Sequence, residues 1–186
     1  MAILRRPGPP ASAVVAANRD EFYARPAHGP TVLVDQPRVV GGLDLEKRGS
    51  WFGVTAGGLL AVLTNQPEPD GWPRAGRRSR GEIVIEVLQQ GTRDAARAWL
   101  SQIDAREYNG FNLLFGDAAA MDVAYGRSDR AEVDFEPVPY GLSVLPNGRL
   151  NQANNEKVAR ALALLRPSIE APWTALEPAM RAAMAD

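Results

Sequence analysis

A short apolar run near the start of the chain ends directly in four polar residues. Residues 13–17 (Ala-Val-Val-Ala-Ala) have the composition of a buried strand, and residues 18–21 (Asn-Arg-Asp-Glu) follow without a spacer. Side chains alternate along a strand, so Asn18 and Asp20 share one face and Arg19 lies on the other. Charges at the end of a buried strand are costly unless they are paired. The run therefore predicts either an ion-pair network or a functional site.

Several further motifs accompany this run along residues 1–165. They are Arg-Arg-Pro-Gly at 5–8, Gly-Ser-Trp-Phe-Gly-Val at 49–54, Leu-Thr-Asn at 63–65, Ser-Arg-Gly-Glu at 79–82 and Tyr-Asn-Gly-Phe-Asn at 108–112. In content and order this set resembles the NRDE family, which is named after the 18–21 tetrapeptide and includes the transport and Golgi organisation 2 proteins. That family is similar in fold to N-terminal-nucleophile hydrolases. The resemblance therefore implies a four-layer α-β-β-α sandwich of two antiparallel sheets.

Composition limits the partners that this chain can have. Its 186 residues fit one domain, so we expect a single domain over residues 1–186. A net charge of −1 gives no long-range attraction for nucleic acid or anionic lipid. The absence of cysteine and the presence of one histidine exclude disulfides, thiolate metal sites and multi-histidine metal sites. We expect no membrane span, no signal peptide, no metal and no cofactor, and a cytoplasmic protein. The sequence does not predict an oligomeric state.

Apolar alternation predicts two groups of strands. The first covers residues 1–4 (as an edge strand), 13–17, 31–35, 38–41, 51–55 and 59–64, and the second covers 111–115, 121–125, 133–135 and 138–145. Residues 56–58 (Ala-Gly-Gly) predict the turn of a hairpin, and the pair Gly41 and Gly42 predicts another turn. Residues 26–30 predict an exposed loop that contains His28. A proton shuttle or a metal ligand is the alternative role for this histidine.

Helical periodicity is present between and after these groups. Residues 79–90 predict a helix that begins at Ser79, with Glu82 in the position of a capping box. Further helices are expected from about residue 92 to 105, over 156–165 and after Pro172. We expect the Ser79 hydroxyl to accept a backbone hydrogen bond, and Arg80 to have a carboxylate partner or a bound anion. This order of strands and helices indicates the α+β class with two antiparallel sheets and helices outside.

The polar run at 18–21 supplies the first candidate catalytic residues. Choloylglycine-type amidases, which are related to the NRDE family, carry Arg-Asn-x-Asp at the end of an early strand. Against this pattern Asn18 and Asp20 match in place. Ala17 stands where those amidases have arginine, so Arg19 is the candidate for that role from the opposite strand face. We expect Asp20 to be largely buried and hydrogen-bonded, with Asn18 facing the same cavity.

Two asparagines at later strand ends are the candidate oxyanion donors. Asn65 ends the apolar run at 59–64, and Asn147 follows the run at 144–146. Both resemble asparagines that supply the oxyanion hole in the related amidases. Asparagine is also a common turn former, and that simpler role is an equal alternative for either residue alone. We expect Asp20, Asn65 and Asn147 to converge on one cavity near the N-terminus.

The nucleophile is absent from the sequence given. The resemblance implies a start of Met-Cys-Thr, and matching residues 5–8 and 18–21 to the family puts its cysteine about three residues before Ala2. We therefore expect the native start to lie upstream, and the family's strands to continue beyond residue 186. With that cysteine the resemblance implies hydrolysis of small amides, and without it the chain is inactive as a hydrolase. The alternatives are natural loss of the nucleophile, giving a binding or trafficking protein for a hydrophobic ligand such as haem, and a structural interaction module.

Overall fold

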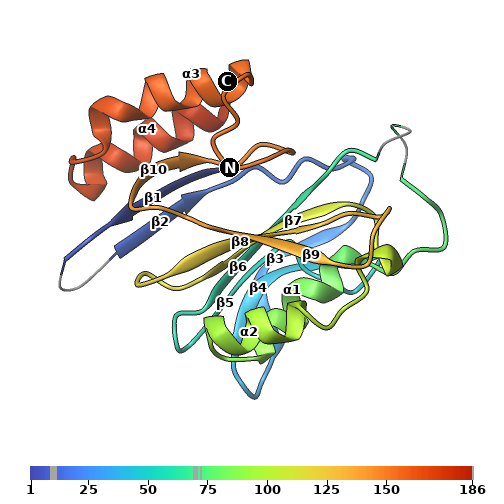
Figure 1. Cartoon of the computed structure of the whole chain (residues 1–186). Coiled ribbons are helices and arrows are strands. Elements are labelled where there is room, and N and C mark those ends of the chain that lie inside the picture. Colours follow the sequence, from blue (N-terminus) through green and yellow to red (C-terminus); the bar gives the residue numbers. More distant parts are fainter. Residues whose placement is uncertain (9–11, 69–70, 72, 186) are drawn as a thin grey trace. The chain divides into compact units, whose positions relative to one another are not determined.

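The computed structural model describes residues 1–8, 12–68, 71 and 73–185 (Figure 1). The chain forms two compact units. Unit 1 combines both ends of the chain, Met1–Asp20 and Val138–Asp186, and unit 2 is the continuous segment Glu21–Pro137. Each unit has its own sheet, its own helices and its own apolar core. The single domain expected over residues 1–186 stays a prediction.

Unit 1 is a three-stranded antiparallel sheet with two helices packed on it (Figure 1). Its elements are β1 (Ala2–Arg6), β2 (Ser12–Ala16), β10 (Gly141–Val144), α3 (Glu156–Leu165), the 3-10 turn η2 (Arg166–Ser168) and α4 (Trp173–Ala185). Ala2 and Leu4 of β1 pack against Leu165 of α3 and against Leu176 and Met180 of α4. All five residues are nearly or fully buried, so the helices are held on the sheet by apolar burial.

The edge position predicted for residues 1–4 is wrong, because β1 is paired on both sides. Ala2 lies opposite Val144 of β10 and opposite Ala16 of β2. The strand is consequently buried along most of its length, and Ala2 and Ile3 have no exposed surface. An uncharged apolar run is compatible with an edge or a central position. The partner that decides between them lies more than 130 residues further along the chain.

Unit 2 is a seven-stranded antiparallel sheet in the order β3-β4-β5-β6-β7-β8-β9. The strands are β3 (Ala27–Val34), β4 (Val39–Asp44), β5 (Phe52–Thr55), β6 (Leu60–Asn65), β7 (Phe111–Gly116), β8 (Met121–Gly126) and β9 (Val133–Pro137). The predicted hairpin around residues 56–58 is confirmed as β5 and β6. The α+β class with two antiparallel sheets and flanking helices is confirmed as well.

The segment of the chain between β6 and β7 contains helices that cover part of this sheet. They are α1 (Arg80–Gln89), α2 (Arg93–Leu100) and the 3-10 turn η1 (Ala105–Glu107). α1 packs on β5 and β6, and its buried side chains are Ile83, Val84, Val87 and Leu88. Arg93 and Arg97 of α2 form ion pairs with the buried Asp122 of β8, at 2.7 and 3.3 Å. In the part of the chain that the structure describes, no helix is both long and apolar enough to cross a lipid bilayer.

The Gly41–Gly42 pair lies inside β4 and does not form the predicted turn. A Cβ atom on Gly41 would clash with the backbone of Phe52 and Gly53, and one on Gly42 would clash with the ring of Trp51. These glycines therefore permit close approach of the neighbouring chain. Local sequence does not distinguish this use of a glycine pair from a turn.

α1 begins after Ser79 as predicted, but the Ser79 hydroxyl does not cap it. The backbone carbonyl of Ser79 accepts from the Glu82 amide at 3.1 Å, and no side-chain cap bond is made. The Glu82 carboxylate, which a capping box would direct to residue 79, accepts from Arg78 at 3.1 and 3.2 Å. The predicted cap is therefore wrong: the Ser79 hydroxyl makes no cap bond, and the Glu82 carboxylate is paired with Arg78.

Candidate functional site

The start of β1 lies beside the segment that follows β10, within unit 1. The Met1 α-amino group donates to the Leu145 carbonyl oxygen at 3.1 Å, and the Leu145 amide donates to the Met1 carbonyl oxygen at 2.9 Å. The two residues thus form the next rung of the β1–β10 ladder. Burial lowers the pKa of the α-amino group from its ordinary value of 8.0. This favours the neutral amine, which is the form that accepts a proton.

The loop of residues 145–150 contains Asn147, which is exposed, and Asn151 closes it. The Asn151 amide donates to the Val144 carbonyl oxygen at 2.8 Å, and its Oδ1 accepts from the Val144 amide, also at 2.8 Å. Its Nδ2 donates to Ser143 Oγ at 3.2 Å. Its φ of 51° lies in the left-handed region, which asparagine enters more readily than most residues. Sequence analysis did not identify Asn151. The local signal is a second asparagine four residues after Asn147.

Residues 18–20 follow β2 at the end of a segment of unit 1. Asn18 Nδ2 donates to the Met184 carbonyl oxygen at 2.5 Å, so this carboxamide holds α4. Arg19 is half-buried, and Asp20 is exposed. Among the described residues, no hydrogen bond or ion pair to the Asp20 side chain is present. The predicted burial of Asp20 is wrong because β2 ends at Ala16, four residues earlier.

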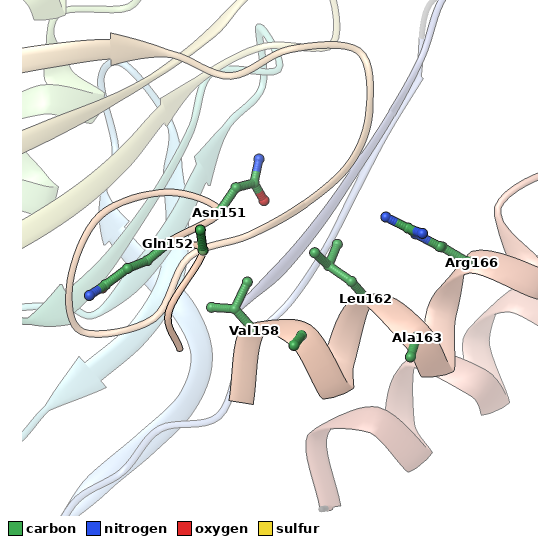
Figure 2. A pocket seen from close by; sticks show the side chains of 8 residues that line it. Asn151, Gln152, Val158, Leu162, Ala163 and Arg166 are labelled. Carbon is green, nitrogen blue, oxygen red and sulfur yellow. The ribbon is translucent and has the colours of Figure 1, made fainter. Parts of the chain in front are cut away.

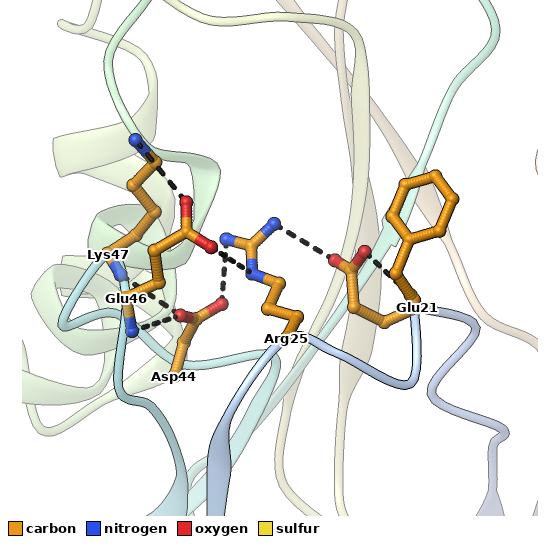
Figure 3. A network of polar contacts seen from close by, with 6 residues as sticks. Glu21, Arg25, Asp44, Glu46 and Lys47 are labelled. Carbon is orange, nitrogen blue, oxygen red and sulfur yellow. Dashed lines mark hydrogen bonds and ion pairs between the residues drawn. The ribbon is translucent and has the colours of Figure 1, made fainter.

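Glu21 begins unit 2 and belongs to an ion network centred on Arg25 (Figure 3). Arg25 Nη1 lies 3.0 Å from Glu21 Oε2, Arg25 Nη2 lies 2.8 Å from Asp44 Oδ2, and Arg25 Nε lies 4.0 Å from Glu46 Oε2. The polar run at 18–21 is therefore divided, and its last residue takes the ion-pair role that the sequence left open. Sequence analysis did not identify Arg25, although its spacing of four residues from Glu21 is a local signal.

The network shifts the ionisation of both central groups. Burial alone would raise the pKa of Asp44, but hydrogen bonds from the Lys47 and Glu46 amides and from Arg25 outweigh it, and the pKa is lowered. Burial alone would lower the pKa of Arg25, but Asp44, Glu21 and Glu46 outweigh it, and that pKa is raised. Both groups stay charged at neutral pH. The network is thus suited to holding the fold and not to proton transfer.

Asn65 is the last residue of β6, opposite Phe111 of β7, and it is exposed. Its predicted position at a strand end is confirmed. Next to it in the chain, Gln66 Nε2 donates to Oδ1 of the buried Asn112 at 2.5 Å. Asn65 lies in unit 2, whereas Asn147 lies in unit 1. Their convergence on one cavity stays a prediction.

Among the described residues, the Arg80 side chain makes no ion pair with a carboxylate, and the alternative of a bound anion stays a prediction. Arg80 Nη1 donates to the Gly110 carbonyl oxygen at 3.0 Å. The Gly110 amide in turn donates to Oε1 of the buried Glu68 at 2.6 Å. Burial lowers the pKa of Arg80, and the charges of Glu68 and Glu21 offset part of this effect. Arg80 thus ties the start of α1 to the residue before β7.

The described residues offer little to a metal or a haem group. His28, the one histidine of the sequence, is exposed on β3 and not in the predicted loop, and its Nδ1 lies 2.9 Å from the Gly29 carbonyl oxygen. Met121 and Met180 are buried in the two units. No group of three or more acidic or histidine side chains in the described ranges could hold a metal ion. The sequence offers one histidine and four methionines as possible ligands of haem iron, without a paired motif.

Comparisons with known proteins agree with the fold. The family model "Transport and Golgi organisation 2" matches residues 2–183. The Transport and Golgi organization protein 2 homologs of Bos taurus and Homo sapiens are 39% and 36% identical over 140 residues, covering 70% of this chain and 49% of each relative. The chain thus spans about half the length of these curated relatives.

Among solved structures, the Caenorhabditis elegans N-acylethanolamine-hydrolyzing acid amidase ortholog is similar with a TM-score of 0.56. The sequences are 13% identical, and the match covers 80% of this chain and 68% of that one. At this identity the likeness shows the fold alone, which is of the N-terminal-nucleophile hydrolase type. The chain belongs to the Transport and Golgi organisation 2 family.

Proposed function

We propose that this protein is the scaffold of an amidohydrolase that acts on small amides, with an N-terminal cysteine two residues before Met1 as its nucleophile. The observation that carries the proposal is the register of β1 against β10 and β2. The shared fold allows this chemistry without identifying a substrate, because one fold supports many functions. The proposal therefore concerns the reaction class, and the particular amide is left to experiment.

The register of β1 gives the position that a preceding cysteine would occupy. Each step back along one antiparallel strand is a step forward along its partner. Ala2 faces Val144 and Ala16. The partner strands end at Val144 and Ala16, and hydrogen bonds between Met1 and Leu145 add one more rung. If Cys-Thr ahead of the present start extends the ladder by two further rungs in the same register, the cysteine is opposite Asn147 on one side and Arg19 on the other. Directly opposite residues share a sheet face, with Cβ atoms about 4.5–5.5 Å apart.

The added cysteine would also lie on the face of the unit 1 sheet opposite to the helices. It has the same alternation as Ile3 and Arg5, whereas Ala2 and Leu4 face the helices α3 and α4. The thiol is therefore directed away from both helices. Within unit 1, a thiol, a carboxamide and a guanidinium would come together on one face.

The reaction follows from these groups. The α-amino group of the cysteine takes the thiol proton, and the sulfur attacks the amide carbonyl. A C–S bond forms, the π electrons move to the oxygen, and Asn147 donates a hydrogen bond to that oxyanion. Collapse of the intermediate expels the amine, which takes the proton, and leaves a thioester that water hydrolyses. The positive charge of Arg19 stabilises the thiolate.

The remaining candidate residues have different support. Asn65 is proposed as a second oxyanion donor on the family resemblance alone. Asp20 is proposed to orient the α-amino group, and its exposure leaves its carboxylate open to a partner. Asn18 is proposed to act indirectly, because its carboxamide already holds α4 through Met184.

The test is the reactivity of a cysteine placed at this position. Cys-Thr is added before Met1, the initiator methionine is removed, and alkylation by iodoacetamide is followed against pH. Ala185→Cys in the unextended chain supplies a reference thiol on an exposed residue. We expect the N-terminal thiol to have a pKa clearly below the ordinary value of about 8.5, and Arg19→Gln to move it back toward that value. Equal titration of the two thiols would remove the hydrolase proposal.

In that event the binding or trafficking alternative for a hydrophobic ligand would remain. The sequence gives weak support for haem as that ligand, because His28 is the single histidine and no paired ligand motif is present. A direct check is the Soret band of the unextended protein mixed with haemin, compared with His28→Ala. The amidohydrolase proposal expects the two spectra to be the same.

A further inference from the structure

The carboxamide of Asn151 is used in an unusual way at the outer edge of β10. Val144 directs its amide and carbonyl away from β1, since the neighbouring Leu145 makes the β1 rung. Asn151 satisfies both groups, through its own amide at 2.8 Å and its Oδ1 at 2.8 Å. Asn151 therefore occupies the place of a further strand, and it closes the loop of residues 145–150 onto the end of β10.

A third bond fixes the orientation of this carboxamide. Asn151 Nδ2 donates to Ser143 Oγ at 3.2 Å, and Ser143 is fully buried. Figure 2 shows Asn151 beside a pocket of about 260 Å³ along α3, with its carboxamide directed away from Val158. Asn151 lines this pocket, and the polar atoms of its side chain are bonded to Val144 and Ser143 of β10.

The other end of the same loop is tied to Met1, as the paired bonds with Leu145 show. Asn147 thus sits in a short loop whose two ends are fixed by hydrogen bonds, while its own side chain is exposed. A donor for an oxyanion needs this combination, because a side chain on an untied loop loses the geometry that stabilises the transition state.

We propose that Asn151 is a positioning residue for Asn147: by clamping the loop to Val144, it holds the Asn147 carboxamide in place for the oxyanion. This inference rests on the proposed function and names a residue that the reaction itself does not touch. Asn151 acts through the loop and makes no contact with substrate.

The test separates acylation of the added cysteine from its alkylation. Acylation by p-nitrophenyl acetate passes through an oxyanion, whereas alkylation by iodoacetamide does not. Both rates are measured in the Cys-Thr-extended protein and in four variants: Asn147→Ala, Asn151→Gly, the double variant and Asn151→Asp. Glycine tolerates the positive φ of residue 151, so Asn151→Gly removes the two side-chain bonds of the clamp without backbone strain and keeps the backbone amide that donates to Val144.

We expect Asn147→Ala to slow acylation by about 10- to 100-fold with alkylation unchanged within about twofold. Asn151→Gly should slow acylation by about 10-fold. The double variant should be no slower than Asn147→Ala, because Asn151 acts only through Asn147 and the two effects are not additive. Asn151→Asp keeps an oxygen for the Val144 amide and should recover most of the acylation rate. A purely structural role would lower both rates together or neither.

The hydrogen bond from the Val144 amide to Asn151 is also tested in the protein without the Cys-Thr extension. Hydrogen exchange of the Val144 amide should become faster in Asn151→Gly, and remain slow in Asn151→Asp. Normal acylation in an Asn151→Gly protein with a released Val144 amide overturns the positioning role and leaves the proposed function intact. Additive effects in the double variant overturn it as well. Acylation that does not depend on Asn147 overturns both proposals.

Discussion

The Arg25 network of unit 2 and the Met1 end of unit 1 both place polar groups at strand ends, but they differ in what is held. In the network the side chains are paired, and Arg25 lies within 3.0 Å of both Glu21 and Asp44. At the Met1 end the backbone is held by hydrogen bonds, while the side chains of Asn147 and Asp20 are exposed. Paired charges stabilise a fold, whereas open groups on a fixed backbone are available for ligands.

The largest effect that tests this contrast is expected at Arg25. Arg25→Ala leaves the Asp44 carboxylate, whose side chain is 13% exposed, without its cation. Removing one partner of a largely buried pair costs more than losing a surface pair, and we expect a loss of about 2 kcal/mol in the free energy of unfolding. Urea denaturation at pH 7 measures it.

Lys47→Ala is the matched control within the same network. Lys47 is 58% exposed and lies 3.7 Å from Glu46, so its loss should change the free energy of unfolding by less than about 0.5 kcal/mol. Equal effects of the two substitutions would mean that the network is an ordinary solvated surface cluster, and the contrast with the Met1 end would fail.

The two units also differ in how a helix begins, and there we expect a smaller effect on the free energy of unfolding. Asn155 Oδ1 accepts from the Val158 amide at 3.2 Å at the start of α3, whereas the Ser79 hydroxyl makes no cap bond at α1. We therefore expect Asn155→Ala to cost about 1 kcal/mol and Ser79→Ala only a few tenths. Urea denaturation of both variants provides the measurement, and the reverse order would contradict the observed caps.

These results also show how far the sequence alone reaches. The hairpin at 56–58 and the helix at 79–90 follow local patterns, and both were predicted. The central position of β1 was not, because it depends on β10 at the far end of the sequence. The pairing of Arg25 with Asp44 likewise depends on contact between β4 and the segment before β3. Alternation predicts which side chains share a face, but not what covers that face.

The candidate site shows the same limit. Asn147 was chosen from its place after an apolar run, and the structure ties Leu145, two residues before it, to the start of β1. The burial of Asp20 was predicted from charge at a strand end, and it fails because β2 ends four residues earlier. Asn151 was missed because two of its three bonds are made with the backbone of Val144, which a sequence pattern does not distinguish.

The α-amino group of Met1 is expected to have a smaller effect on the free energy of unfolding than the helix cap Asn155. Burial lowers its pKa below 8.0 in the folded protein, so the unfolded chain binds more protons between the two pKa values. The free energy of unfolding should then rise with pH through the window that ends near 8.0, and this contribution should be constant above it. N-terminal acetylation removes the group, so the difference between the acetylated and free proteins isolates it. A difference that does not change from pH 6 to 9 would contradict the effect of burial.

The smallest effect on stability is expected at Asp20, and it decides what the exposed residues of unit 1 are for. Asp20 and Asp35 are both exposed, so Asp20→Asn and Asp35→Asn should each change the free energy of unfolding by less than about 0.5 kcal/mol. If Asp20 orients the amine of a preceding cysteine, Asp20→Asn should still alter the pH dependence of thiol alkylation in the Cys-Thr-extended protein, whereas Asp35→Asn should not. A loss of more than about 1 kcal/mol in Asp20→Asn alone would mean that Asp20 is held by contacts, like Glu21. Unchanged stability together with unchanged alkylation would assign Asp20 to the solvated surface and leave Arg19 and Asn147 as the groups around the nucleophile.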